Sequence, residues 1–132
     1  MDAREIYLAG GCFWGTEAYL KKLPGIIDTE VGYVNANIEN PSYEDVCTGT
    51  TNAAEAVKVT YDADVISLPL LLQAYLRTIN PFSLNRQGND VGTQYRTGIY
   101  WTDPADARAA ESLLMELAHK AGKQPRVEAA LL

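Results

Sequence analysis

The sequence has few of the residues on which disulfide-stabilised folds and metal sites depend. Among its 132 residues there are only two cysteines and one histidine. Two cysteines are too few for a disulfide scaffold, which favours a reducing compartment, so we expect a cytoplasmic protein. The same count leaves no set of metal ligands with a recognisable spacing. We therefore expect neither a metal ion nor a bound cofactor.

Long apolar runs and basic clusters are missing as well. No stretch approaches the roughly 20 apolar residues of a membrane-spanning helix, and the first five residues do not have the pattern of a signal peptide. The formal net charge is −6 at pH 7, and no basic patch stands out along the chain. These absences argue against a nucleic acid or a membrane as the partner of this protein.

What the sequence does contain is enough apolar material for one globular domain over residues 1–132. Hydrophobic residues make up 47% of the chain, which is typical of a folded protein with a real core. Period-two and helical patterns alternate along the chain and predict four strands, three helices and an apolar tail at 127–132. The strands are predicted at 4–9, 27–33, 56–61 and 98–101, and the helices at 14–23, 68–79 and 103–121. This order indicates an α+β, ferredoxin-like β-α-β-β-α-β fold, in which helices pack on an antiparallel sheet.

Two long polar segments, 35–53 and 83–97, show neither periodicity. Loops of this length in a small domain are usually functional. Both lead into strands that can lie beside the first strand, so the two loops can meet at one end of the sheet. The first loop carries Tyr43, for which a packing role that pins the loop is an equal alternative. The second carries Asp90 and Tyr95, and a loop-capping aspartate is the alternative for Asp90.

Residues 10–15, Gly-Gly-Cys-Phe-Trp-Gly, form the segment around which the chain is organised. The two glycines permit a sharp turn between the first strand and the first helix. Cys12 is therefore expected in or just before the first helical turn, where free N–H groups and the helix dipole favour a thiolate. The alternative is an ordinary buried cysteine in an apolar turn. The combination of two glycines, a cysteine and two large aromatic residues favours a functional site.

Four segments of the chain resemble the A-type peptide methionine sulfoxide reductases. Residues 11–15, Gly-Cys-Phe-Trp-Gly, resemble the active-site motif of that family. Residues 40–49, 54–57 and 85–96 resemble its second, third and fourth blocks. The four blocks follow one another in the family's order between residues 6 and 101, which makes the resemblance specific.

The resemblance implies that Cys12 is the nucleophile and Glu55 the acid in the reduction of a sulfoxide. Glu55 stands between small residues, and an apolar environment would raise its pKa and keep its proton on. An exposed charge at the end of a strand is the simpler interpretation of Glu55 without the family block. With the block, we expect a buried general acid.

The resemblance also implies roles for the residues around these two. Tyr43 and Tyr95 would hydrogen-bond the sulfoxide oxygen. Phe13 and Trp14 would hold the methyl group of the substrate. Asp90 would order this network or contact the reductant.

The reaction implied by the resemblance is reduction of the S epimer of methionine sulfoxide, free or in oxidised proteins that need repair. It leaves a sulfenic acid on Cys12. Thioredoxin, a glutaredoxin or a small thiol is the expected external reductant. Many relatives carry resolving cysteines in a C-terminal tail, and the only other sulfur of this kind here is Cys47. We interpret Cys47 as a small buried residue and the protein as a one-cysteine enzyme.

The family usually continues beyond the point that corresponds to Leu132, with a segment that contains a Tyr-His pair. We therefore expect a single catalytic domain without the usual C-terminal segment. Two other classes of function compete with this interpretation. One is a glutaredoxin-like thiol–disulfide exchanger with a single active cysteine. The other is a ferredoxin-like module that binds a small molecule without catalysis.

Overall fold

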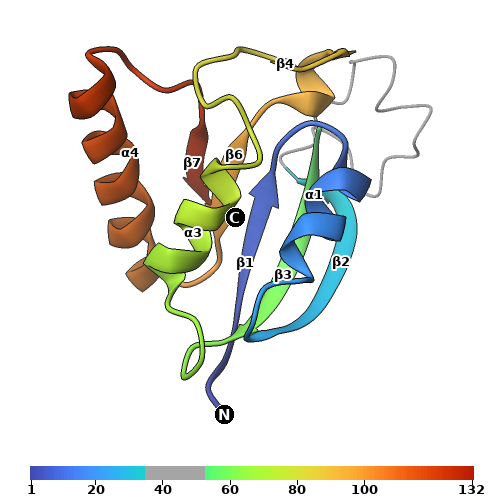
Figure 1. Cartoon of the computed structure of the whole chain (residues 1–132), viewed down its shortest axis with the longest axis vertical. Helices are drawn as coiled ribbons and strands as arrows, with labels where there is room; N and C mark the ends of the chain where they lie inside the picture. Colours follow the sequence, from blue (N-terminus) through green and yellow to red (C-terminus); the bar gives the residue numbers. More distant parts are fainter. Residues whose placement is uncertain (35–52) are drawn as a thin grey trace.

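The computed structural model describes residues 1–34 and 53–132 (Figure 1). Tyr43 and Cys47 lie outside the described residues. The strands are β1 (Ala3–Ala9), β2 (Ile26–Val34), β3 (Ala54–Asp62), β4 (Arg86–Gln87), β5 (Asp90–Val91), β6 (Gly98–Trp101) and β7 (Glu128–Leu131). The α-helices are α1 (Phe13–Leu20), α3 (Leu68–Leu76) and α4 (Ala107–Ala121), with short 3₁₀ turns at Thr93–Tyr95 and Pro104–Asp106.

Five strands form one mixed sheet in the order β2-β3-β1-β6-β7. The pairs β2–β3, β3–β1 and β1–β6 are antiparallel, whereas β6 and β7 are parallel. The expectation of a purely antiparallel sheet, with an apolar tail at 127–132, is therefore wrong at this edge. β7 runs parallel to β6 because the long helix α4 returns the chain to the end of the sheet at which β6 began.

The three described α-helices pack on one face of the sheet (Figure 1). Strand residues that alternate along the chain point into this layer, as the period-two pattern predicts. Ile6 and Leu8 of β1 and Val57 and Val59 of β3 are completely buried there. They pack against residues of the helices, among them Leu20 of α1, Leu71, Leu72 and Tyr75 of α3, and Ala110 of α4. Each fully buried aliphatic side chain contributes about 1.5–3 kcal/mol to this core.

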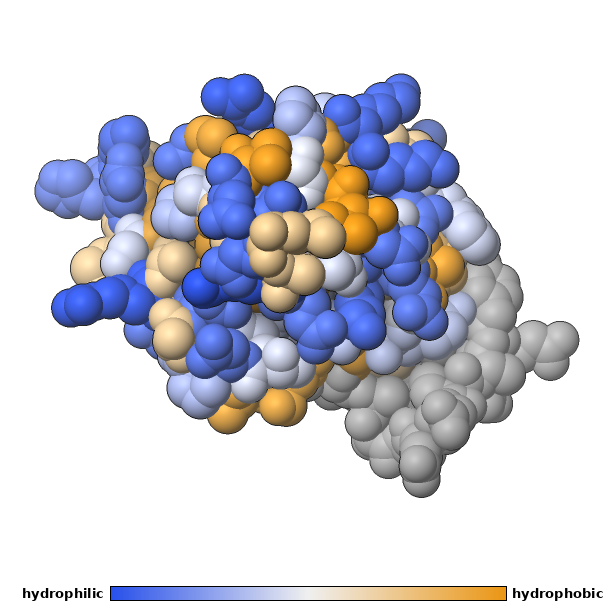
Figure 2. All heavy atoms as spheres, turned by 90° about the horizontal axis from the view of Figure 1, so that it is seen from below, coloured by the Kyte–Doolittle hydropathy of each residue, from blue (hydrophilic) through white to orange (hydrophobic). Residues whose placement is uncertain are grey.

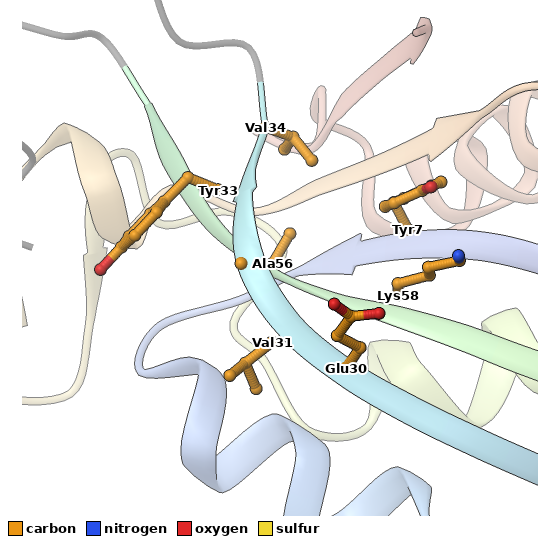
Figure 3. A pocket seen from close by; sticks show the side chains of 8 residues that line it. Tyr7, Glu30, Val31, Tyr33, Val34, Ala56 and Lys58 are labelled. Carbon is orange, nitrogen blue, oxygen red and sulfur yellow. The ribbon is translucent and has the colours of Figure 1, made fainter. Parts of the chain in front are cut away.

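The other face of the sheet carries a second, smaller apolar cluster that includes Ala9, Ala56 and Tyr100. A cavity of about 250 Å³ lies at its β2 side, beside Tyr7 and Lys58 (Figure 3). Figure 3 shows the alternation along β2: Val31 points towards α1, whereas Glu30 points towards Lys58. Cys12 does not line this cavity, so we do not consider the cavity as the candidate site.

The candidate site residues in the described part of the chain gather where β1 ends. Because β3 and β6 run antiparallel to β1, both strands begin beside its last residue, and Ala9 pairs with Ala56 on one side and Gly98 on the other. The β4–β5 hairpin lies at the same end of the molecule, at the top of Figure 1, opposite the N-terminus. Figure 2 views the far end from below and shows a surface covered mainly by hydrophilic residues.

Candidate active site

A tight glycine turn connects β1 to α1 and places Cys12. Gly11 has φ +70°, a conformation that side chains with a Cβ adopt only under strain. Gly10 has no room for a side chain, because a Cβ there would lie 2.4 Å from the Cγ2 atom of Ile79. The two glycines therefore allow the sharp reversal of the chain that the sequence predicts. The missing Cβ of Gly10 also lets the turn approach Tyr75 of α3 and Ile79 beyond it closely.

Cys12 is the N-cap residue of α1. Its backbone is extended, with φ −67° and ψ 122°, and its carbonyl accepts hydrogen bonds from the N–H groups of Gly15 and Thr16 at 3.2 and 3.4 Å. It is a free cysteine and is partly exposed. The helix dipole favours negative charge at this position. A thiolate at Cys12 would therefore lie at the positive end of α1 and within reach of solvent.

Glu55 lies inside β3 and not at its exposed end. Only 1% of the residue is exposed, and its Oε1 atom accepts a hydrogen bond from the Phe13 N–H at 3.2 Å. Burial raises the pKa of the Glu55 carboxyl above its ordinary value of 4.5; the bond from Phe13 opposes this, and the charge of Asp90 adds to it. The interpretation of Glu55 as an exposed strand-end charge is therefore excluded. A buried carboxyl whose pKa is raised is thus hydrogen-bonded to the residue next to Cys12.

A cavity of about 390 Å³ opens beside Cys12. It lies between the turn, the first part of α1 and the β4–β5 hairpin, and Asp90 and Gln87 line it together with Cys12. Residues of the second polar loop therefore lie beside Cys12. The first loop, with Tyr43, lies outside the described residues.

Tyr95 reaches the same turn through its main chain. It ends the 3₁₀ turn Thr93–Tyr95, and its carbonyl accepts a hydrogen bond from the Gly11 N–H at 3.2 Å. Of the residues implied by the resemblance, Cys12, Glu55, Asp90 and Tyr95 are therefore brought to the end of β1.

The two aromatic residues after Cys12 differ in their surroundings. Phe13 is 8% exposed and belongs to the core, whereas Trp14 is 61% exposed. Their rings meet edge to face with centroids 5.2 Å apart. Successive residues of a helix point about 100° apart, so only one of the two can face the core. Trp14 is left on the surface, where a bound substrate can contact it.

Tyr33 adds a third ring to the Phe13–Trp14 pair, and the sequence did not predict a role for it. Its ring centroid lies 5.6 Å from that of Phe13, and its residue pairs with Glu55 across β2 and β3. The alternation of β2 places Tyr33 on the helix-facing side together with Val31. The same alternation could have indicated Tyr33 from the sequence, because it places a tyrosine on the helix-facing side at the end of the strand nearest the turn.

Gln87 was also missed. Its side-chain amide accepts a hydrogen bond from Asn80 N at 2.8 Å and donates one to Asn80 O at 2.9 Å. This pair of bonds ties the short β4–β5 hairpin to the segment after α3 and so keeps the hairpin over Cys12. Gln87 lies within the fourth family block, but nothing in the sequence predicted this contact, because its partners are backbone groups.

Among residues 1–34 and 53–132, no group of three or more histidine, cysteine, aspartate and glutamate side chains could hold a metal ion. None of the helices in this described part of the chain has the length and apolar character required to cross a bilayer.

The chain is similar to known proteins along most of its length. Residues 4–130 match the family model described as peptide methionine sulfoxide reductase. The peptide methionine sulfoxide reductase MsrA of Mycoplasma genitalium is 54% identical over 114 residues, which cover 86% of this chain and 73% of that protein.

Solved structures agree with the sequence comparison. The methionine sulfoxide reductase A of Corynebacterium diphtheriae superposes with a TM-score of 0.87 at 34% identity, over 98% of this chain and 65% of that one. Mxr1 from Saccharomyces cerevisiae in complex with Trx2 gives a TM-score of 0.69 at 25% identity, over 96% of this chain and 73% of that one. The described fold is therefore that of the methionine sulfoxide reductases, and this chain spans about two thirds to three quarters of their length.

Proposed function

Because the chain belongs to the family of A-type peptide methionine sulfoxide reductases, the peptide-methionine (S)-S-oxide reductases, we propose that it reduces the S epimer of methionine sulfoxide to methionine. The substrate is free methionine sulfoxide or an oxidised methionine of a protein, so the role is the repair of oxidised proteins. One observation carries this proposal. A cysteine at a helix N-cap lies next to a buried carboxyl with a raised pKa, which hydrogen-bonds the residue after the cysteine.

The first step transfers oxygen from the substrate to the enzyme. The Cys12 sulfur attacks the sulfoxide sulfur, and Glu55 gives its proton to the departing oxygen. Oε1 of Glu55 accepts the Phe13 N–H, so the proton lies on Oε2. The protonated oxygen then becomes bonded to the Cys12 sulfur, while the substrate S–O bond and the new bond between the two sulfurs both break. Methionine leaves and Cys12 ends as a sulfenic acid. The substrate sulfur gains two electrons and the Cys12 sulfur loses two, which balances the step.

The surrounding residues bind the substrate and stabilise the polarised oxygen. We assign the hydroxyls of Tyr43 and Tyr95 to the sulfoxide oxygen, and Phe13 and Trp14 to the methyl group. Asp90 orders the polar side of the cavity or contacts the reductant. Two observations support this division: the Phe13 and Trp14 rings follow Cys12 directly at the start of α1, and Gln87 and Asp90 of the hairpin line the cavity beside Cys12.

An external thiol completes the cycle. Two thiols of the reductant donate two electrons, the sulfenic acid oxygen leaves as water, and Cys12 returns to the thiol. Thioredoxin is the reductant that the comparisons favour, since Mxr1 has been seen in complex with Trx2. A glutaredoxin or a small thiol is the alternative, and the partial exposure of Cys12 gives access to any of them.

One turnover without reductant is expected to leave a sulfenic acid on Cys12, because we propose that Cys47 does not resolve it. Dimedone should trap this acid, and mass spectrometry should find the adduct on the peptide that contains Cys12. Cys47→Ser should keep most of its activity with dithiothreitol or a glutaredoxin. A dominant disulfide between Cys12 and Cys47 after a single turnover would contradict the one-cysteine mechanism.

The two epimers of the substrate should react at very different rates. We expect peptides with the S epimer of methionine sulfoxide to be reduced at least about tenfold faster than peptides with the R epimer, because a site that orients both oxygen and methyl rejects the mirror arrangement. The measurement is turnover of the separated epimers with dithiothreitol. Equal rates would contradict the assignment, and no turnover of either would favour a thiol–disulfide exchanger or a binding module.

We also propose that β1, α1, β2, β3, α3 and β6 form a ferredoxin-like unit, to which α4 and β7 are added. The strand order β2-β3-β1-β6 and its three antiparallel pairs support this interpretation. The cytoplasmic location remains a prediction from the low cysteine count.

A further inference from the structure

We propose that Tyr75 is a positioning residue for Cys12, acting through the main chain at the end of β1. The proposal rests on the proposed function, in which Cys12 must meet the sulfoxide in line with the Glu55 proton. Tyr75 belongs to α3 and lies outside the cavity that holds Cys12. Tyr75 therefore contributes by positioning the nucleophile Cys12 and does not contact the substrate.

The Tyr75 hydroxyl is a polar group in the interior of the protein. The residue is completely buried, and burial raises the pKa of its phenol far above the ordinary value of 10.0. The hydroxyl therefore stays protonated and acts as both donor and acceptor. It donates to the carbonyl of Ala9 and accepts a hydrogen bond from the Gly98 N–H at 3.1 Å, with the Gly98 carbonyl a further 3.2 Å acceptor.

The position of these partners gives the hydroxyl its significance. Ala9 is the last residue of β1, three residues before Cys12, and Gly98 is the first residue of β6. The hydroxyl thus joins the two strands at the point from which the turn departs. It also fixes both of them to α3, whose Leu71 and Leu72 are completely buried in the core.

Among residues 1–34 and 53–132, Tyr75 is one of four side-chain or main-chain groups whose hydrogen bonds hold consecutive parts of the turn. Thr16 Oγ1 donates to the Gly10 carbonyl at 2.9 Å, and the Tyr95 carbonyl accepts the Gly11 N–H at 3.2 Å. Glu55 accepts the Phe13 N–H. Three of these contacts come from residues at the cavity or the proposed site, whereas Tyr75 alone reaches the turn from the core of the sheet and helices. Removing the Tyr75 contact therefore tests the position of Cys12 without changing a group that takes part in the proposed reaction.

Tyr75→Phe keeps the aromatic ring and removes only the hydroxyl. The Ala9 carbonyl and the Gly98 N–H then lose a partner in a buried place, and the end of β1 shifts to find new ones. Displacements of about 1 Å at a reacting group cost up to about a hundredfold in rate, so we expect the single-turnover rate of sulfoxide reduction to fall by about tenfold to a hundredfold. The rate of Cys12 alkylation by iodoacetamide, measured in a Cys47→Ser background, should change by less than about twofold, because a small electrophile needs no alignment with Glu55.

Tyr61→Phe is the matched control. Tyr61 is also a buried tyrosine, with 1% of the residue exposed. It lies near the end of β3, six residues after Glu55, and pairs with Arg4 far from the turn. We expect the single-turnover rate of Tyr61→Phe, per folded molecule, to stay at the wild-type value. Equal rate losses in Tyr61→Phe and Tyr75→Phe would overturn the proposal, and so would a wild-type rate in Tyr75→Phe.

An osmolyte separates misplacement from unfolding if Tyr75→Phe is only partly folded. Sucrose favours the compact state, and circular dichroism reports the folded fraction. A rate that returns to the wild-type value as the folded fraction recovers would overturn the proposal, whereas a rate that stays low in the refolded protein supports it. Activity retained by Cys12→Ser would instead refute the proposed function, whatever Tyr75→Phe shows.

Discussion

Cys12→Ser should show no reduction of methionine sulfoxide above the uncatalysed background. Serine has the shape of cysteine, but its hydroxyl does not ionise near neutral pH and cannot take up the sulfoxide oxygen as a sulfenic acid. The N-cap position itself tolerates the change, because serine is among the preferred N-cap residues. We therefore expect the free energy of unfolding to change by no more than about 1 kcal/mol.

The measurement is turnover of an oxidised methionine peptide with dithiothreitol, together with denaturant unfolding of the same samples. Cys47→Ser is the matched control, since it removes the other sulfur and should keep most of the activity. Activity of Cys12→Ser within a few fold of wild type would show that Cys12 is not the nucleophile. Loss of activity with loss of folding would be visible in the unfolding curve.

Glu55→Gln should slow the chemical step by a factor of about 10²–10⁴, the usual contribution of a positioned general acid. Glutamine keeps the size of the side chain and can still accept the Phe13 N–H, but it has no acidic proton to give. In the wild type the protonated form is lost as pH rises through the raised pKa of Glu55, so the single-turnover rate should fall there. Glu55→Gln should lack this fall with rising pH.

Stability provides a second measure of the same carboxyl. The folded-state pKa is raised above the ordinary value of 4.5, so the unfolded chain gives up its proton first. The contribution of Glu55 is fully present below the unfolded pKa and is lost as pH rises through the folded one. The denaturant midpoint of the wild type should therefore fall, relative to that of Glu55→Gln, as pH rises from about 4.5.

Asp106→Asn is the matched control for Glu55→Gln. Asp106 is also a buried carboxyl, at the start of α4, and burial raises its pKa as well. It does not line the cavity of Cys12. Its replacement should alter the pH dependence of stability but leave the single-turnover rate unchanged. An unaltered single-turnover rate in Glu55→Gln would show that Glu55 has only a structural role.

The site could be predicted from the sequence as far as local patterns and the family blocks extend. The Gly-Gly-Cys turn and the N-cap position of Cys12 follow from the chemistry of glycine and of helix ends. Local patterns did not predict the burial of Glu55, because β3 begins at Ala54 and not at residue 56 as predicted. This two-residue difference places Glu55 within a strand that is paired on one side with β2, where alternation directs it into the core. Without the family block, the sequence alone favoured an exposed charge.

Other parts of the structure depend on partners distant in sequence, which a local pattern does not reveal. β7 has only four residues, of which just Ala130 is even partly buried, and it is a strand because β6 lies beside it. The β4–β5 hairpin has two residues in each strand and depends on the Gln87 bonds to Asn80. Short elements of this kind have no periodicity to detect, because their conformation is set by tertiary contacts.

The central position of β1 in the sheet has a consequence for synthesis of the chain. β1 is the first strand to leave the ribosome, yet both of its neighbours are made much later, and the bonds that complete its end join residues 42 and 66 positions apart. Until then, an apolar strand with two unpaired edges is exposed to other nascent chains. Contacts of such long range also slow folding, because each closes a large loop before it stabilises anything. We therefore expect nascent chains that stop before β6 to depend on chaperones and to have no reductase activity, since no earlier intermediate contains the complete turn around Cys12.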